Sequence, residues 1–276
     1  MNSYIDPHIH MVSRTTDDYK RMAIAGCVMV SEPAFWAGFD RSGPEGFRDY
    51  FRQLTEYEKK RAEAYGIAHH AWLCINAKEA ENVELSRAVI KMIPEFLEND
   101  RVLGIGEIGL NKNTRNEATI FLEHLDLAAE LDELVLVHTP HLVDKYQVTR
   151  MILDMVRGEQ RIAPHRVLID HVEEHTIKPA LDAGHWVGMT LYPISKCTPA
   201  RAADMVEMYG TDRMMVNSAG DWGHSDPLAV PEFIFEMRSR GHDEALIHKI
   251  VFENPLAFFR QCRRFQPEKP RTVVSS

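Results

Sequence analysis

Eight short apolar runs, separated by longer amphipathic stretches, constrain the fold of this chain more than any other feature. A run such as Leu134–Val137 is apolar without alternation, which is typical of parallel strands buried on both faces. The predicted strands are Tyr4–Ile9, Cys27–Ser31, Ala68–Ile75, Val102–Ile105, Leu134–Val137, Val167–Ile169, Trp186–Leu191 and Met214–Asn217. Strands that alternate with helices in this way predict the α/β class, as a single (β/α)8 TIM barrel.

The chain is long enough for one such barrel. It has 276 residues, of which 45% are apolar and 26% charged, as in ordinary globular proteins. We expect residues 1–264 to form the barrel and the Pro-rich, polar residues 265–276 to form a mobile tail. The cysteines are far apart and form no CxxC pair, which favours free thiols. The sequence shows no signal peptide and no apolar run of membrane-spanning length, so we expect a cytoplasmic protein.

The net charge bears on possible partners. The chain has 32 basic and 41 acidic residues and a formal charge of −9. Phosphate contacts need clustered lysine and arginine, so this charge disfavours a nucleic-acid partner without excluding a local basic patch. A small-molecule substrate is the expected partner, and the sequence does not fix an oligomeric state.

Two histidines mark the end of the first predicted strand, in Asp6-Pro7-His8-Ile9-His10. Residues two apart on a strand face the same side, so His8 and His10 are expected to point together. Two imidazoles on one face provide half of a metal site.

Four further candidates follow other predicted strands: Glu107, His138, His171 and Asp221. Each has a plainer interpretation, as a solvated acid, a turn residue or a hydrogen-bonded core histidine. Because the strand ends of a barrel meet at one face, we expect these side chains to converge there. Imidazoles and carboxylates together predict a divalent ion such as zinc, manganese, iron or nickel.

The order of these motifs resembles the TatD-related metal-dependent hydrolases, within the wider amidohydrolase superfamily. The resemblance runs from Ile5 to about Phe259 and includes the closing segment Glu253–Phe259. It implies a barrel with one or two divalent ions. The first ion would be held by His8, His10, Glu107 and Asp221, and the second, in a binuclear centre, by Glu107, His138 and His171.

The sequence departs from the family pattern in two places. The usual Glu-Thr-Asp, small residue, Pro motif is replaced by Asn217-Ser218-Ala219-Gly220-Asp221, and the Asp that often follows GE-x-G-L is Asn111. The DNase activity of the family is therefore not carried over directly.

A metal-bound water supplies the expected chemistry, since metal binding lowers the pKa of water from about 15.7 to about 7. Asp221 is the predicted general base. Glu173 and Glu174 either orient a metal-bound imidazole or form a solvated acidic loop.

The loop 32–39 is unusually aromatic and predicts contacts with a flat or apolar substrate. The alternative is that its rings pack the loop onto the barrel. The predicted substrate-binding residues are Glu32, Trp36, His141 and Trp222. Basic residues near strand ends either bind a carboxylate or phosphate or are ordinary solvated charges; they are Arg14, Lys112, Arg115, Lys145 and Lys196.

Three functions remain open. The leading hypothesis is a metal-dependent hydrolase that cleaves an ester, lactone, amide or phosphoester bond of a small molecule. The second is a TatD-like metal-dependent nuclease, which should show salt-sensitive DNA binding. The third is a non-catalytic barrel that binds a metabolite or scaffolds other proteins, with a closed structural metal site.

Overall fold

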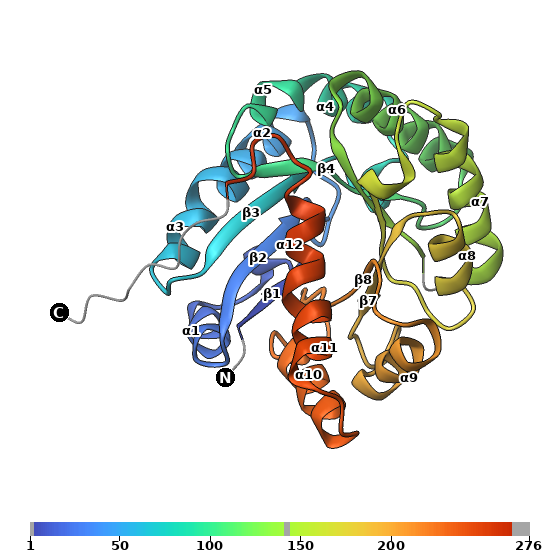
Figure 1. Cartoon of the computed structure of the whole chain (residues 1–276). Helices are drawn as coiled ribbons and strands as arrows, with labels where there is room; N and C mark the ends of the chain where they lie inside the picture. Colours follow the sequence, from blue (N-terminus) through green and yellow to red (C-terminus); the bar gives the residue numbers. More distant parts are fainter. Residues whose placement is uncertain (1–2, 141–143, 267–276) are drawn as a thin grey trace.

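Eight parallel strands form the centre of the computed structural model, which describes residues 3–140 and 144–266. Their order in the sheet is their order in the chain, and the helices surround them (Figure 1). The strands are β1 Tyr4–Asp6, β2 Cys27–Pro33, β3 Ala68–Leu73, β4 Val102–Gly109, β5 Leu134–His138, β6 Val167–Ile169, β7 Trp186–Thr190 and β8 Met214–Asn217.

Helices connect each strand to the next. The α-helices are α1 Thr16–Ile24, α2 Pro44–Arg52, α3 Glu58–Glu63, α4 Val83–Met92, α5 Pro94–Leu97, α6 Arg115–Leu131, α7 Lys145–Gly158, α8 Ile177–Asp182, α9 Pro199–Tyr209, α10 Ala229–Ser239, α11 Glu244–His248 and α12 Asn254–Phe259. Shorter 3-10 and π segments are η1 Met11–Ser13, η2 Gln53–Tyr57, η3 Ala77–Glu79, η4 Pro164–Arg166 and η5 Lys249–Glu253. The predicted (β/α)8 TIM-barrel fold is confirmed.

Hydrogen bonds just beyond β1 and β8 bring the two ends of the sheet together. The backbone N–H of Ala219 donates to the carbonyl of His8 at 2.7 Å, and that of His10 donates to Gly220 at 2.9 Å. The Asp6 carboxylate also accepts from the backbone N–H of Ser218 at 3.2 Å. These contacts place the segment after β8 beside the segment that carries the first two predicted metal ligands.

Two apolar layers stabilise the barrel. The larger layer fills the space between the strands and the surrounding helices. A smaller cluster lies inside the barrel, where residues near the strand starts, such as Ala68 and Leu134, pack with Phe258 and Phe259 of the α12 helix. The Trp72 ring stacks on Phe258 with centroids 6.1 Å apart. The C-terminal helix therefore covers the end of the barrel where the strands begin, and the opposite end is left for the site.

Most predicted strands lie within a few residues of the observed ones, with two informative differences. The β1 strand ends at Asp6 instead of Ile9, and β4 continues to Gly109 instead of ending at Ile105. Most of the predicted tail, residues 267–276, lies outside the described residues, so the division into a barrel and a tail stays a prediction. Within the described ranges, no helix has both the length and the apolar character needed to cross a membrane.

Candidate metal centre

The first two histidines lie in the loop just after β1, where Pro7 and His8 form a bend. Since the strand ends at Asp6, strand alternation alone does not explain why His8 and His10 face one another. Their segment is held on both sides instead: the backbone beside them bonds to Ser31 at 3.1 Å and to Gly220 at 2.9 Å. The two Nε2 atoms lie 3.1 Å apart. His8 and His10 therefore point together as predicted, but a loop held by its neighbours brings them together, not a strand.

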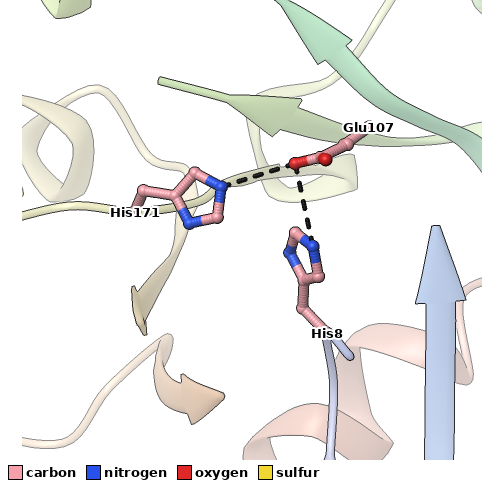
Figure 2. Close-up of side chains that lie close together, drawn as sticks. All are labelled: His8, Glu107 and His171. Atoms are coloured by element: carbon pink, nitrogen blue, oxygen red, sulfur yellow. Dashed lines mark hydrogen bonds and ion pairs between the residues drawn. The ribbon is translucent and has the colours of Figure 1, made fainter. Parts of the chain in front are cut away.

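Glu107 lies at the centre of the cluster, within β4 (Figure 2). Its Oε2 atom is 3.2 Å from His138 Nδ1, 3.4 Å from His171 Nε2 and 3.7 Å from His8 Nε2. Its Oε1 atom is 3.7 Å from His10 Nε2. One carboxylate thus contacts four imidazoles that come from three different segments of the chain.

The glycine before Glu107 has a steric reason. A Cβ atom on Gly106 would lie 2.7 Å from the Cβ of Leu136 on the neighbouring strand. Real Cβ atoms do not approach so closely, so only glycine lets β4 and β5 come together here. This close approach places Glu107 beside His138, at the end of β5.

The cluster is buried and chemically suited to a divalent ion. Ligand atoms of His8, Glu107 and His171 all lie within 4.8 Å of one another, and the three side chains are at most 2% exposed (Figure 2). Nitrogen and carboxylate donors at this spacing fit zinc, manganese, iron or nickel. The residues present therefore fit the metal that the sequence predicts.

The protonation states also favour metal binding. Burial alone would raise the pKa of Glu107, but the neighbouring imidazoles hold it well below its usual range. Burial lowers the pKa of His10 to about 3 and lowers the pKa of His138 and His171. The pKa of His8 is raised instead, because the carboxylates of Glu107 and Asp170 outweigh its burial. Neutral imidazoles keep a free lone pair, and an ionised carboxylate is the form that binds a cation.

Asp170 supports the cluster from behind, and sequence reasoning missed it. Its fully buried carboxylate accepts hydrogen bonds from His8 Nδ1, from the backbone N–H of His171 at 2.8 Å and from Asn217 Nδ2 at 2.8 Å. A carboxylate on the outer nitrogen fixes the tautomer and turns the other nitrogen toward a metal. The position of Asp170 directly before a strand-end histidine was the available signal.

The acids considered for this supporting role lie elsewhere. Glu174 forms a two-pronged ion pair with Arg201, with two nitrogen–oxygen distances of 2.6 Å. Glu173 contacts Lys145 at 3.7 Å. Both acids therefore belong to the charged loop that was the alternative interpretation.

Asp221 lies at the edge of the cluster. Its Oδ1 atom accepts from the Tyr192 hydroxyl at 2.9 Å and from the backbone N–H of Gly223 at 2.8 Å. Its charge acts on His10 and Lys196. Within the described residues, no hydrogen bond joins Asp221 to a predicted metal ligand. Its roles as ligand and base stay predictions.

The aromatic loop 32–39 contacts the cluster through Phe35, which was not predicted from the sequence as a site residue. The Phe35 ring stacks on His10, with centroids 4.0 Å apart and planes 21° apart. Trp36 and Trp222 meet nearby, where the Trp222 indole N–H donates to the Trp36 carbonyl at 3.3 Å. The loops after β2 and β8 therefore form a shared aromatic rim, which keeps both tryptophans as candidates for substrate contact.

Glu32, another predicted substrate residue, is not on this rim. It has no exposed surface, accepts from the backbone N–H of Val12 at 2.8 Å and lies 2.7 Å from His69 Nε2. Its predicted contact with substrate stays a prediction. His141 lies outside the described residues.

Comparisons with known proteins agree with this site. Residues 5–260 match the model of the family described as TatD related DNase. The chain belongs to this family. It is therefore an enzyme of the metal-dependent hydrolase type.

Individual relatives extend the comparison. An uncharacterized metal-dependent hydrolase of Methanocaldococcus jannaschii is 28% identical over 93% of this chain and 99% of its own. A TatD-like protein from Archaeoglobus fulgidus has a similar structure, with a TM-score of 0.76 and 25% identity over 93% of this chain and 100% of that one. The phosphotriesterase homology protein from Escherichia coli shares the fold, with a TM-score of 0.69 and 15% identity over 93% and 98%.

Proposed function

We propose that this enzyme cleaves an ester, lactone, amide or phosphoester bond of a small molecule, with one or two divalent ions in a binuclear or mononuclear centre. The observation that carries the proposal is the buried Glu107 carboxylate surrounded by four imidazoles. A divalent ion held there would lower the pKa of a bound water to about 7 and polarise the bond to be cleaved. The site lies at the strand ends, where barrel enzymes carry out their chemistry.

The protein side chains have separate tasks. The Oε2 atom of Glu107 faces three imidazoles, so Glu107 and these imidazoles would together hold the ion or ions. Asp170 holds the outer nitrogen of His8, so that its Nε2 atom faces the cluster. The Thr190 hydroxyl lies 2.7 Å from His171 Nδ1 and fixes that ring in the same way.

Asp221 is the proposed general base. The Tyr192 hydroxyl and the Gly223 N–H both bind Oδ1 and so fix the orientation of the carboxylate. Its proposed step is to accept a proton from the attacking water and to return it to the leaving group.

Replacing Asp221 with Asn tests this assignment. Loss of a general base typically lowers the rate by about 10²–10⁴-fold, and we expect kcat to fall by at least that amount when the variant is assayed with saturating metal. Asp212→Asn is a matched control, because that side chain is 86% exposed. Full activity in Asp221→Asn, with wild-type metal content, would remove Asp221 from the mechanism.

The family description favours one second candidate, hydrolysis of DNA. A nuclease that neutralises several phosphates loses DNA affinity steeply as salt rises. DNA cleavage with such a salt dependence, and no turnover of small esters, lactones, amides or phosphoesters, would select the nuclease.

A further inference from the structure

Three lysines follow alternate strands of the barrel and so lie at the face that carries the metal cluster. Lys78 belongs to η3 after β3, Lys145 begins α7 after β5, and Lys196 lies in the loop after β7. Lys145 is already engaged, since its ammonium group donates to the Pro140 carbonyl at 3.2 Å and contacts Glu173 at 3.7 Å. Lys78 and Lys196 differ from Lys145 because, among the described residues, no ion pair joins either of them to an acid.

Lys196 lies at the edge of the cluster, beside Tyr192. Its ammonium group is 4.8 Å from the centre of the Tyr192 ring, and the Tyr192 hydroxyl donates to Asp221 at 2.9 Å. Burial lowers the pKa of Lys196, and the charges of Glu107, Asp221 and Asp170 act against that shift. Within residues 3–140 and 144–266, no direct ion pair joins Lys196 to an acid. A cation placed over a binding centre in this way is available to a ligand.

Lys78 lies on the aromatic side of the same face. Its ammonium group is 5.1 Å from the centre of the Phe35 ring and 5.2 Å from that of Trp36. Phe35 in turn stacks on His10. Among the described residues, Lys78 also has no ion pair with an acid, although it is close enough to Lys196 for the two charges to repel. Two like charges held near each other are stabilised when an anion lies between them.

The strand-end loops also carry exposed apolar side chains. Trp222 is 54% exposed, Phe39 67% and Ile194 77%, and they belong to loops after β8, β2 and β7. Exposed aromatic and aliphatic side chains at a strand-end face are typical of a substrate pocket.

We propose that the substrate carries an anionic group, a carboxylate or a phosphate, bound by Lys78 and Lys196, and an apolar body that lies against Trp36 and Trp222. This inference rests on the proposed hydrolase and names the substrate class of the same site. The scissile bond would then face the metal cluster while the two lysines hold the anionic group. The lysines would thus select which small molecules are cleaved.

Binding to the metal-loaded enzyme tests the inference without requiring turnover. The probes are 4-phenylbutyrate and phenylphosphonate, which separate a carboxylate from a phosphate-like group, and the neutral 4-phenylbutanamide. Calorimetric titration compares the wild type with Lys78→Gln, Lys196→Gln and the double variant. Lys178→Gln is the control, because Lys178 lies on α8, is 61% exposed and pairs with Asp182 at 2.5 Å.

We expect at least one anionic probe to bind the wild type about tenfold more tightly than the amide, as hydrogen bonds to charged groups allow. The double variant should lose this preference while its affinity for the amide and its metal content stay unchanged. Equal binding of all three probes, or an anion preference that survives in the double variant, would overturn the inference. So would salt-sensitive binding of DNA without binding of either small anion.

Hydrolysis of neutral and anionic nitrophenyl esters, measured in parallel, separates this inference from the proposed function. A lysine-dependent anion preference without turnover of any ester, lactone, amide or phosphoester would contradict the proposed small-molecule hydrolase and support the anion site. Hydrolysis of both esters with equal kcat/KM, unaffected by either lysine variant, would support the hydrolase and contradict the anion site.

Discussion

Gly188 on β7 makes room for the Asp170 carboxylate, which orients His8, the first predicted metal ligand. A Cβ atom at this position would lie 2.0 Å from Asp170 Oδ1, 2.9 Å from Asp170 Cγ and 3.1 Å from Asn217 Nδ2. Asp170 is fully buried and is held by several hydrogen bonds, so it has little freedom to move aside. The change Gly188→Ala should therefore push Asp170 away from His8.

Two effects of Gly188→Ala can be estimated. Overpacking a buried site costs about 1–3 kcal/mol of folding free energy, and 1 kcal/mol shifts Tm by about 2–4 °C in domains of about 150–250 residues. Loss of the carboxylate behind a metal-binding histidine typically lowers metal affinity by about 10–100-fold. We expect both effects together, because the same methyl group causes them.

Zinc affinity by chelator competition and thermal unfolding of the metal-free protein measure the two effects separately. Gly158→Ala is a matched control, since a Cβ atom at Gly158 would have no neighbour within 4 Å. Asp170→Asn should also weaken zinc binding without adding volume. Wild-type zinc affinity in Gly188→Ala would refute the argument that Asp170 positions the metal ligand.

Two further changes test the surroundings of the site. Burial and the charge of Glu58 raise the pKa of Glu32 well above its usual range, so the contribution of Glu32 to stability is largest below its unfolded pKa and is lost as pH rises. The Tm of Glu32→Gln relative to wild type should therefore increase from pH 5 to pH 8. An equal Tm difference at both pH values, as expected for the half-exposed control Glu56→Gln, would contradict this prediction. Asn254→Ala should lower the free energy of unfolding by about 1–3 kcal/mol, because the Asn254 amide donates to two backbone carbonyls at 2.7 and 2.6 Å. Urea unfolding that matches the wild type would show that these hydrogen bonds do not contribute to stability.

The sequence was sufficient for the barrel because its apolar runs are the buried strands themselves. Leu134–Val137 shows why: all four side chains are buried, so no alternation was needed to recognise the strand. Strand ends were harder to predict. His8 and His10 face one another without belonging to β1, because partners distant in sequence hold the backbone of their loop.

The candidate site was predictable as a set of ligand types but not as a network. Glu107 and the histidines have residue types that suggest metal binding by themselves. Asp170 carried one local signal, its position directly before a strand-end histidine. The relevance of Phe35 and Lys78 depends on contacts that follow from packing of the finished barrel, so their local sequence does not predict it.

Metal content per chain, measured by elemental mass spectrometry on protein purified without chelator, tests the central claim most directly. The account predicts about one or two divalent ions per chain in the wild type, and a large loss of metal in Glu107→Gln with wild-type content in Glu56→Gln. A wild-type protein that holds no metal after exposure to zinc, manganese, iron and nickel would contradict the account, as would a Glu107→Gln variant with unchanged metal content.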